Sequence, residues 1–209
     1  MTARWIASLE RRLGFLAVPN LALFLAGMNA FSAALTLIKP EFPAQLELEP
    51  LLVMQGQVWR VLTFVFVPPM FGPLGTILWL LMYFSFVNAL EALWGDAKLT
   101  LYVLIGALAT AAASLIFQIP LGSYYFVVSL FLAFARLNPD TEILLFFVIP
   151  VKMRWLAWLA AFLAFWSFLM GGSVAQLAVV SGLLNYALYF GGEHFFELKQ
   201  EWRRRRFGR

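Results

Sequence analysis

The side chains best suited to nucleophilic chemistry are three serines in apolar stretches, Ser123, Ser129 and Ser181. A serine hydroxyl attacks a carbonyl only when a base within hydrogen-bond reach removes its proton. The chain has one histidine, His194, which follows the last apolar stretch, and no lysine lies within an apolar stretch. The chain also has no cysteine. These residue types therefore provide no nucleophile with a matching base.

Two charged residues in apolar surroundings need a separate explanation. Glu91 lies at the end of an apolar segment, and we interpret it as a hydrogen-bonded contact at a helix end. Glu91 and His194 have no metal-ligand spacing, so we expect no metal and no other cofactor. Arg60 follows Trp59 inside the apolar segment 58–67, where a charge is costly unless it is paired or reaches lipid headgroups. We favour a structural role for Arg60, holding this segment against the headgroups beside Trp59.

The elements that must position these residues are membrane-spanning helices. The 209 residues are 63% hydrophobic and 12% charged, with a mean hydropathy of +0.84, which no soluble domain requires. A span needs roughly 20 apolar residues to cross about 30 Å of hydrocarbon. The predicted spans are 14–38, 73–93, 99–117, 123–137, 155–170 and 174–192. The sequence therefore predicts an all-α integral membrane protein, with one six-helix bundle over residues 14–192.

Two elements of this bundle depart from an ordinary span. The connection 40–72 is rich in proline and glutamate at first and apolar later, which predicts a loop at the outer surface that dips into the membrane interface. The fourth span, 123–137, is too short to cross about 30 Å at 1.5 Å per residue. It must be enclosed by other helices, open to water at one end, or lie where the bilayer is thin. It is the first place to look for function.

The distribution of basic residues predicts the orientation of the bundle. Thirteen of the fifteen lysines and arginines fall at the two ends and in alternate loops, and only Lys39 and Arg60 fall in the others. The positive-inside rule then places both termini in the cytoplasm. Residues 1–13 are the predicted cytoplasmic N-terminus, with no signal-peptide pattern, and 193–209 are the predicted basic cytoplasmic tail. The net positive charge of the chain therefore reflects membrane topology rather than nucleic-acid binding. The short loops favour a bacterial inner membrane.

Several strings of residues, read in order, resemble the rhomboid family over most of the chain. The resemblance lies in Trp59-Arg60 with Leu62-Thr63-Phe64, Glu91 with Gly95, Ala133-Phe134-Ala135, Asn138-Pro139, the segment 143–147, Pro150-Val151-Lys152, and the sixth-span segment 174–184. The rhomboid core has six helices, a long first loop in the outer leaflet and an enclosed short fourth helix. The resemblance implies the same fold here.

The same resemblance shows that the rhomboid catalytic residues are missing. The nucleophile position of the Gly-x-Ser-Gly motif, which begins at Gly122, holds Tyr124. The base position in the sixth helix holds Val179, and roughly 22 Å of helix separates it from His194. The remaining catalytic positions hold other residues as well. These are Gln176 at an upstream histidine position, and Gly75 and Trp79 at the oxyanion-supporting positions of the second helix.

The residues at and beside the missing catalytic positions allow two interpretations. In the first, the rings of Tyr124 and Tyr125 fill the space of a catalytic serine and its water, so that the cavity is plugged. In the second, these tyrosines and Gln176 line a polar recess that binds other proteins without cutting them. Gly182 begins a Gly-x-x-x-Gly pattern that Tyr186 leaves incomplete, which weakens the expectation of close packing between the fourth and sixth helices.

The resemblance implies a pseudoprotease comparable to the derlins, rather than an enzyme. It would bind transmembrane client proteins between its second and fifth helices, in contact with the lipid bilayer, for quality control or regulation. A cytoplasmic protease or chaperone is an expected partner of the Arg-rich tail. Two alternatives from other classes remain at this stage. One is a rhomboid protease with unconventional catalytic groups, and the other is a small transporter or channel, although the spans contain almost no charges.

Overall fold

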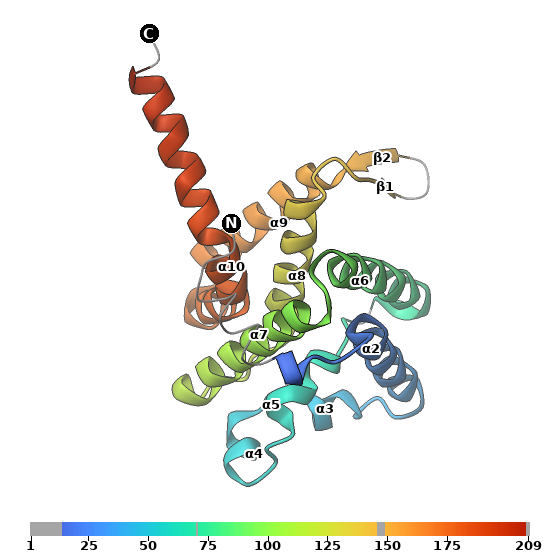
Figure 1. Ribbon diagram of the computed structural model, residues 1–209. Coiled ribbons are helices and arrows are strands. Elements are labelled where there is room, and N and C mark those ends of the chain that lie inside the picture. The colour runs from blue at the N-terminus through green and yellow to red at the C-terminus, as the bar shows by residue number, and fades with distance from the viewer. Residues whose placement is uncertain (1–13, 70, 146–148, 208–209) are drawn as a thin grey trace.

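The chain folds into a bundle of helices with one short hairpin of strands (Figure 1). The computed structural model describes residues 14–69, 71–145 and 149–207, without the side chains of 144, 145, 149 and 193–207. The predicted N-terminal segment 1–13 lies outside the described residues. The elements are η1 Gly14–Leu16, α2 Leu21–Ile38, α3 Pro43–Leu46, α4 Pro50–Met54, α5 Arg60–Thr63, η2 Phe64–Phe66, α6 Gly72–Trp94, α7 Asp96–Phe117, α8 Tyr124–Leu137, β1 Glu142–Leu145, β2 Ile149–Lys152, α9 Met153–Met170 and α10 Gly172–Phe207.

Five of the described helices are long and apolar enough to cross a membrane. They are α2, α6, α7, α9 and the Gly172–Gly192 part of α10. Four of them match predicted spans to within three residues at each end, because continuous apolar runs without charge are read directly from hydropathy. The chain is therefore a mostly helical integral membrane protein.

The predicted start of the first span at residue 14 is wrong. Residues Gly14–Leu16 form a separate 3₁₀ turn, and α2 begins only at Leu21. Asn20 separates this turn from α2, because its φ of 54° and ψ of 41° are left-handed and cannot continue a right-handed helix. Pro19 therefore precedes the helix by two residues instead of lying in its first turn.

The short helix α8 lies in the middle of the bundle, packed against α6, α9 and α10 (Figure 1). Its 14 residues span about 21 Å, less than the hydrocarbon core. Half of its residues are buried, and Phe126 and Leu130 reach the centre of the core beside Tyr102 of α7. Of the three alternatives for this short helix, its contacts with α6, α9 and α10 favour enclosure by other helices on those sides.

The connection between α2 and α6 is a compact loop containing α3, α4, α5 and η2. Arg60 holds it together, because its Nη1 donates to the carbonyl oxygens of Ala44 and Glu47 at 2.7 and 2.9 Å, and its Nε donates to Oε1 of Gln57 at 2.8 Å. Thr63 adds a hydrogen bond to the Leu46 carbonyl. The loop is thus an ordered unit that packs on α7 through α5.

An antiparallel β-hairpin joins α8 to α9, in a segment for which the sequence predicted no strands. Glu142 pairs with Lys152 and Leu145 with Ile149. At its base, Asp140 forms ion pairs with Arg154 at 3.0 Å and Lys152 at 3.9 Å. These contacts place the start of α9 at Met153, two residues before the predicted start.

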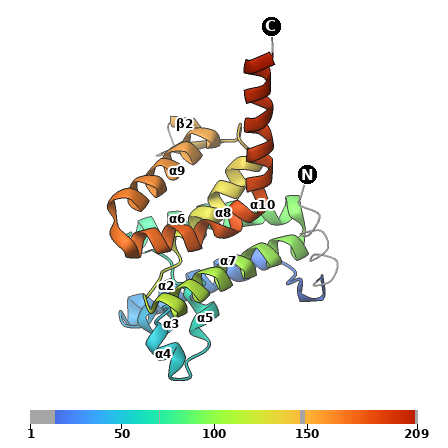
Figure 2. The same cartoon turned by 90° about the vertical axis from the view of Figure 1, so that its left-hand side faces the viewer.

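The two last helices meet at a tight turn, and the second is longer than predicted. Gly172 has a φ of +69°, which glycine adopts without strain and which allows the chain to turn between α9 and α10. The predicted end of the last span at residue 192 agrees with the apolar part of α10, Gly172–Gly192, and the helix itself continues without a break to Phe207. Figure 2 shows this C-terminal part projecting beyond the other helices.

Candidate functional site

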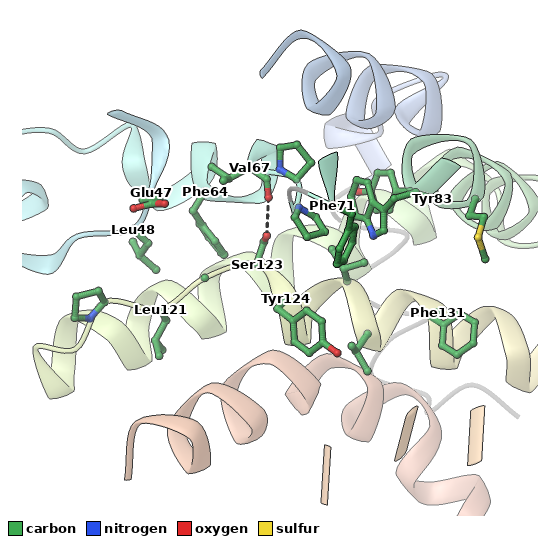
Figure 3. Close-up of a pocket in the computed structure, with 18 of the residues that line it drawn as sticks. Glu47, Leu48, Phe64, Val67, Phe71, Tyr83, Leu121, Ser123, Tyr124 and Phe131 are labelled. Carbon is green, nitrogen blue, oxygen red and sulfur yellow. Dashed lines mark hydrogen bonds between the residues drawn. The ribbon is translucent and has the colours of Figure 1, made fainter. Parts of the chain in front are cut away.

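A cavity of about 520 Å³ lies where α6, α8 and the loop between α2 and α6 meet (Figure 3). Its wall is mainly aromatic and aliphatic, with Phe64 and Phe71 from the loop, Trp79 from α6, and Tyr124 and Phe131 from α8. Trp79 stacks on its helical neighbour Tyr83 with ring centroids 5.0 Å apart and planes 9° apart. The cavity is therefore an apolar space with aromatic walls.

The segment before α8 fixes one side of this cavity to the loop. Leu121 forms an isolated antiparallel bridge with Leu48, and the Ser123 hydroxyl donates to the Val67 carbonyl at 3.1 Å, the contact drawn in Figure 3. Gly122, between them, also lines the cavity, and a Cβ built on it would meet no other atom within 4 Å. The first turn of α8 is thus held beside the loop while space remains next to Gly122.

A second cavity, of about 280 Å³, continues from the first along α8 toward α9. Its α9 wall includes Leu159 and Leu163. In the described part of the chain α6 and α9 each pack on α8 but not extensively on each other. The residues that line both cavities are Met82, Tyr124, Val128 and Phe131. The two cavities therefore form one groove over the face of α8 between α6 and α9.

Tyr124, at the nucleophile position, does not plug this groove. Its side chain is 58% exposed, and its ring meets that of Tyr125 edge-on with centroids 5.0 Å apart. The predicted plug is wrong because the ring extends from the first residue of α8 away from the core, leaving open space beside it. The tyrosine forms a wall of the groove instead of its filling.

The other positions that match the rhomboid catalytic residues are dispersed. Trp79 lines the main cavity together with Tyr124, but Gly75, one turn earlier on α6, does not. Val179 is buried in α10, with 7% of its surface exposed. Gln176 is exposed on α10 and lines neither cavity, so the predicted polar recess of Gln176 and the tyrosines is not formed.

Tyr125 and Gly182 fix α8 to α9 and α10. The Tyr125 hydroxyl donates to Oγ of Ser167 on α9 at 2.6 Å. A Cβ built on Gly182 of α10 would lie 2.5 Å from Cβ of Tyr125 and 2.9 Å from the backbone nitrogen of Phe126. The weakened expectation of close packing between these helices is therefore wrong, because Gly182 alone allows α10 to touch the α8 backbone.

The three serines singled out in the sequence are each hydrogen-bonded to a backbone carbonyl. Ser129 donates to Phe126 at 2.6 Å and Ser181 to Ala178 at 3.3 Å, as Ser123 does to Val67. Each hydroxyl is thus oriented toward a carbonyl acceptor and not toward a base. Within the described residues no group of three His, Cys, Asp or Glu is placed to hold a metal ion.

Arg60 and Trp59 have different surroundings, although the sequence predicted that they lie side by side against the lipid headgroups. Arg60 is only 5% exposed, and its three hydrogen bonds all go to the loop itself, so the predicted headgroup contact is wrong for its guanidinium. A buried guanidinium needs such acceptors because an unpaired charge is costly. Trp59, 53% exposed, is the one of the two that faces outward.

Glu91, near the end of α6, caps the start of α2. Its carboxylate oxygens accept hydrogen bonds from the backbone N–H groups of Leu21 and Ala22, at 2.5 and 3.2 Å. The first N–H groups of a helix have no partner within it, and the positive end of the helix dipole favours a carboxylate. The predicted helix-end contact of Glu91 is confirmed.

Sequence reasoning missed most of the lining of the groove, including Glu47, Glu49, Met82 and Tyr83. The two glutamates are visible in the sequence as acidic loop residues, but no spacing rule joins them to α8. The pairing of Leu48 with Leu121, 73 positions away, brings them there. Met82 and Tyr83 carry no signal that separates them from other apolar residues of a span.

Comparison with known families agrees with this geometry. A family model described as the Der1-like family matches residues 21–203, and no curated protein matches the chain. Der1-like proteins are rhomboid-like membrane proteins that handle substrates of membrane-protein and endoplasmic-reticulum-associated degradation, and they are generally inactive as proteases. The match includes α2, all of α6 to α9 and most of α10, so the chain belongs to the Der1-like family, a pseudoprotease branch of the rhomboid-like superfamily.

Proposed function

We propose that this protein holds transmembrane segments of client proteins in the groove between α6 and α9 without cutting them. The observation that carries the proposal is the continuity of the two cavities along α8, through Met82, Tyr124, Val128 and Phe131. Such a surface fits the side of a helix, since it is apolar and long. The Der1-like family supports the same class of partner, namely membrane proteins.

The helix α9 is suited to move aside for a client. Only Met153 and Ala164 of its eighteen residues are buried, while Trp158 and Phe162 are 73% and 58% exposed. A helix with so few buried contacts separates from its neighbours at lower cost than one packed on several sides. The lateral entrance is therefore on the α9 side of the groove.

The short helix α8 is expected to act on the surrounding lipid. Its length of about 21 Å is less than the hydrocarbon thickness of about 30 Å, and a bilayer thins locally around a short element. If α8 counts as a span, the bundle has six spans, and an even number agrees with the basic residues in favouring both termini in the cytoplasm. A thinner bilayer lowers the cost of polar groups in a client segment. We place the protein in a bacterial inner membrane.

The absence of proteolysis follows from the residues at the catalytic positions. Tyr124 replaces the nucleophile, and the hydroxyls of Ser123, Ser129 and Ser181 donate to backbone carbonyls. Removal of a proton from such a serine requires a base, and Val179 at the base position has none to offer. The groove thus keeps a binding surface and lacks the acyl-transfer chemistry.

The C-terminal end of α10 supplies a second surface for this function. The helix runs 15 residues past the span that ends at Gly192, which is roughly 22 Å, and it carries the arginines at positions 203 to 206. In the proposed orientation this part projects into the cytoplasm. It would present positive charge to a cytoplasmic protease or chaperone that receives the client.

Site-specific photocrosslinking tests the groove directly. A photoreactive amino acid at Met82 or Leu159 should crosslink to transmembrane segments of other proteins in native membranes. The matched control position is Phe31, which is 56% exposed on α2 and lines neither cavity. Stronger crosslinking at Met82 and Leu159 than at Phe31 supports the proposal. Equal yields at all three positions would show only contact with neighbours in the bilayer and would contradict it.

A further inference from the structure

The main cavity combines an apolar interior with an acidic end. Figure 3 shows Glu47 at one end of the cavity and Phe131 at the other. Among the described residues that line the cavity, Glu47 and Glu49 are the only charged ones. Glu47 is exposed and Glu49 is half-buried. The charge is therefore confined to the end that the loop between α2 and α6 lines.

Neither glutamate is neutralised by a described partner. The ion pairs formed by Asp140 with Lys152 and Arg154 include neither of them. Arg60 is close to Glu47, but its Nη1 donates to the backbone carbonyl of that residue and not to its carboxylate. The connection between α2 and α6 carries three glutamates against Lys39 and Arg60, so negative charge is in excess there. A negative potential therefore remains at this end of the cavity.

A second group in the cavity also lacks a partner. Tyr83 lines the cavity from the middle of α6, its side chain is 3% exposed, and its hydroxyl has no hydrogen-bond partner among the described residues. Oδ1 of Asn29 and Oγ of Ser32 are also unpartnered, but they belong to α2 and do not line the cavity. A buried hydroxyl without a partner is costly, and an occupant with a polar group at this depth would satisfy it.

We infer that the preferred occupant is a transmembrane segment with lysine or arginine at its outer flank. The inference rests on the proposed function, and it names the class of client. The apolar wall accepts the body of the segment, the carboxylates of Glu47 and Glu49 bind its basic flank, and Tyr83 bonds to a polar side chain within it. Charges that complement each other across an interface select one partner over another.

This selection distinguishes wrongly inserted segments from correctly inserted ones. In the proposed orientation the glutamates lie on the outer side of the membrane. Correctly inserted segments carry their excess of basic residues on the cytoplasmic side. A segment with lysine on the outer side is therefore an inverted or unassembled one, and the acidic end of the cavity favours it. The groove thus distinguishes the orientation of a transmembrane segment by the charge on its outer flank.

The test measures capture of single-span segments that differ only in flanking charge. Purified full-length protein with a photocrosslinker at Met82 is reconstituted in neutral lipid vesicles with a segment whose outer flank is Lys-Lys, Gln-Gln or Glu-Glu. We expect the lysine flank to crosslink about fivefold more than the glutamine flank, and the glutamate flank less than either. The same two lysines moved to the inner flank should give no such gain.

Three variants locate the effect. The double variant Glu47→Gln, Glu49→Gln should bring the ratio between lysine and glutamine flanks to about one, and Glu47→Lys, Glu49→Lys should invert the preference. Glu41→Gln is the matched control, because Glu41 is exposed in the same loop but does not line the cavity. It should keep the fivefold ratio. Each variant is first shown to be monodisperse and to melt as the wild type does.

The failure of this inference differs from the failure of the proposed function. Equal capture of all three flanks by the wild type would overturn the charge selection and leave client binding in place. No capture of any segment would overturn both. A lysine preference that survives in the Glu47→Gln, Glu49→Gln variant would also overturn the inference, because the preference would then arise elsewhere on the protein.

Discussion

At the scale of single residues, the walls of the groove and the contacts that hold the backbone are made by different side chains. Tyr124 forms a wall of an open groove, while Gly182 allows α10 to touch the first turn of α8. Glu91 and Arg60 satisfy backbone groups that the fold would otherwise leave unpaired. The residues that support the fold are thus separate from the side chains that form the walls of the groove.

The glycine at 182 gives a prediction with a matched control. Gly182→Ala places a methyl group 2.5 Å from Cβ of Tyr125, so α8 and α10 must separate and stability should fall by about 1–3 kcal/mol. Gly122→Ala has open space and should change stability by less than about 0.5 kcal/mol. Thermal melting in detergent compares the two variants with the wild type. Equal melting temperatures for both variants would show that the close approach at Gly182 is not required.

At the scale of elements, the groove depends on how α9 is held. This helix has two buried residues, and the hydrogen bond from Tyr125 to Ser167 is a direct side-chain tie between α8 and α9. A hydrogen bond in a membrane interior contributes about 0.6 kcal/mol on average, so its loss shifts the position of α9 without unfolding the bundle. We therefore expect this bond to hold α9 close to α8 on the lateral side of the groove, and we call it the latch.

Removal of the hydrogen bond between Tyr125 and Ser167 should broaden the distribution of distances between α6 and α9. The chain has no cysteine, so spin labels can be attached at introduced cysteines at Ile77 and Phe162, which are 55% and 58% exposed. Ser167→Ala should give a broader distribution with longer distances in a pulsed dipolar measurement. Ser85→Ala removes a hydroxyl that bonds only within α6, to the Leu81 carbonyl, and should leave the distribution as in the wild type. A narrow, unshifted distribution for Ser167→Ala would contradict the latch.

At the scale of the whole molecule, hydropathy and proline or glycine positions predict most of the helices. The long spans, the short α8 and the turn at Gly172 are set by local composition, and the sequence places them within a few residues. The missed features depend on distant contacts or on special backbone geometry. The late start of α2 requires the left-handed Asn20 and the Glu91 cap from another helix, 70 positions away.

The groove is the part of the site that the sequence predicts least well. Motif positions predict that Tyr124 and Trp79 share one site, and they do. Whether two large rings fill or border a space depends on where the backbones of α6, α8 and the loop lie, and only the folded chain determines this. The same reason explains why Gln176, one turn from Val179 on α10, faces away from the groove.

The most direct test of the whole account scores capture and cleavage in one sample. The wild-type protein and a Tyr124→Ser, Val179→His double variant are reconstituted in proteoliposomes with a full-length transmembrane substrate and an active-site-directed serine probe. The account predicts that the wild type retains the substrate intact, copurifies with it and is not labelled by the probe. Reproducible cleavage of the substrate by the wild type, or its failure to retain any substrate, would contradict a groove that binds transmembrane segments without cutting them.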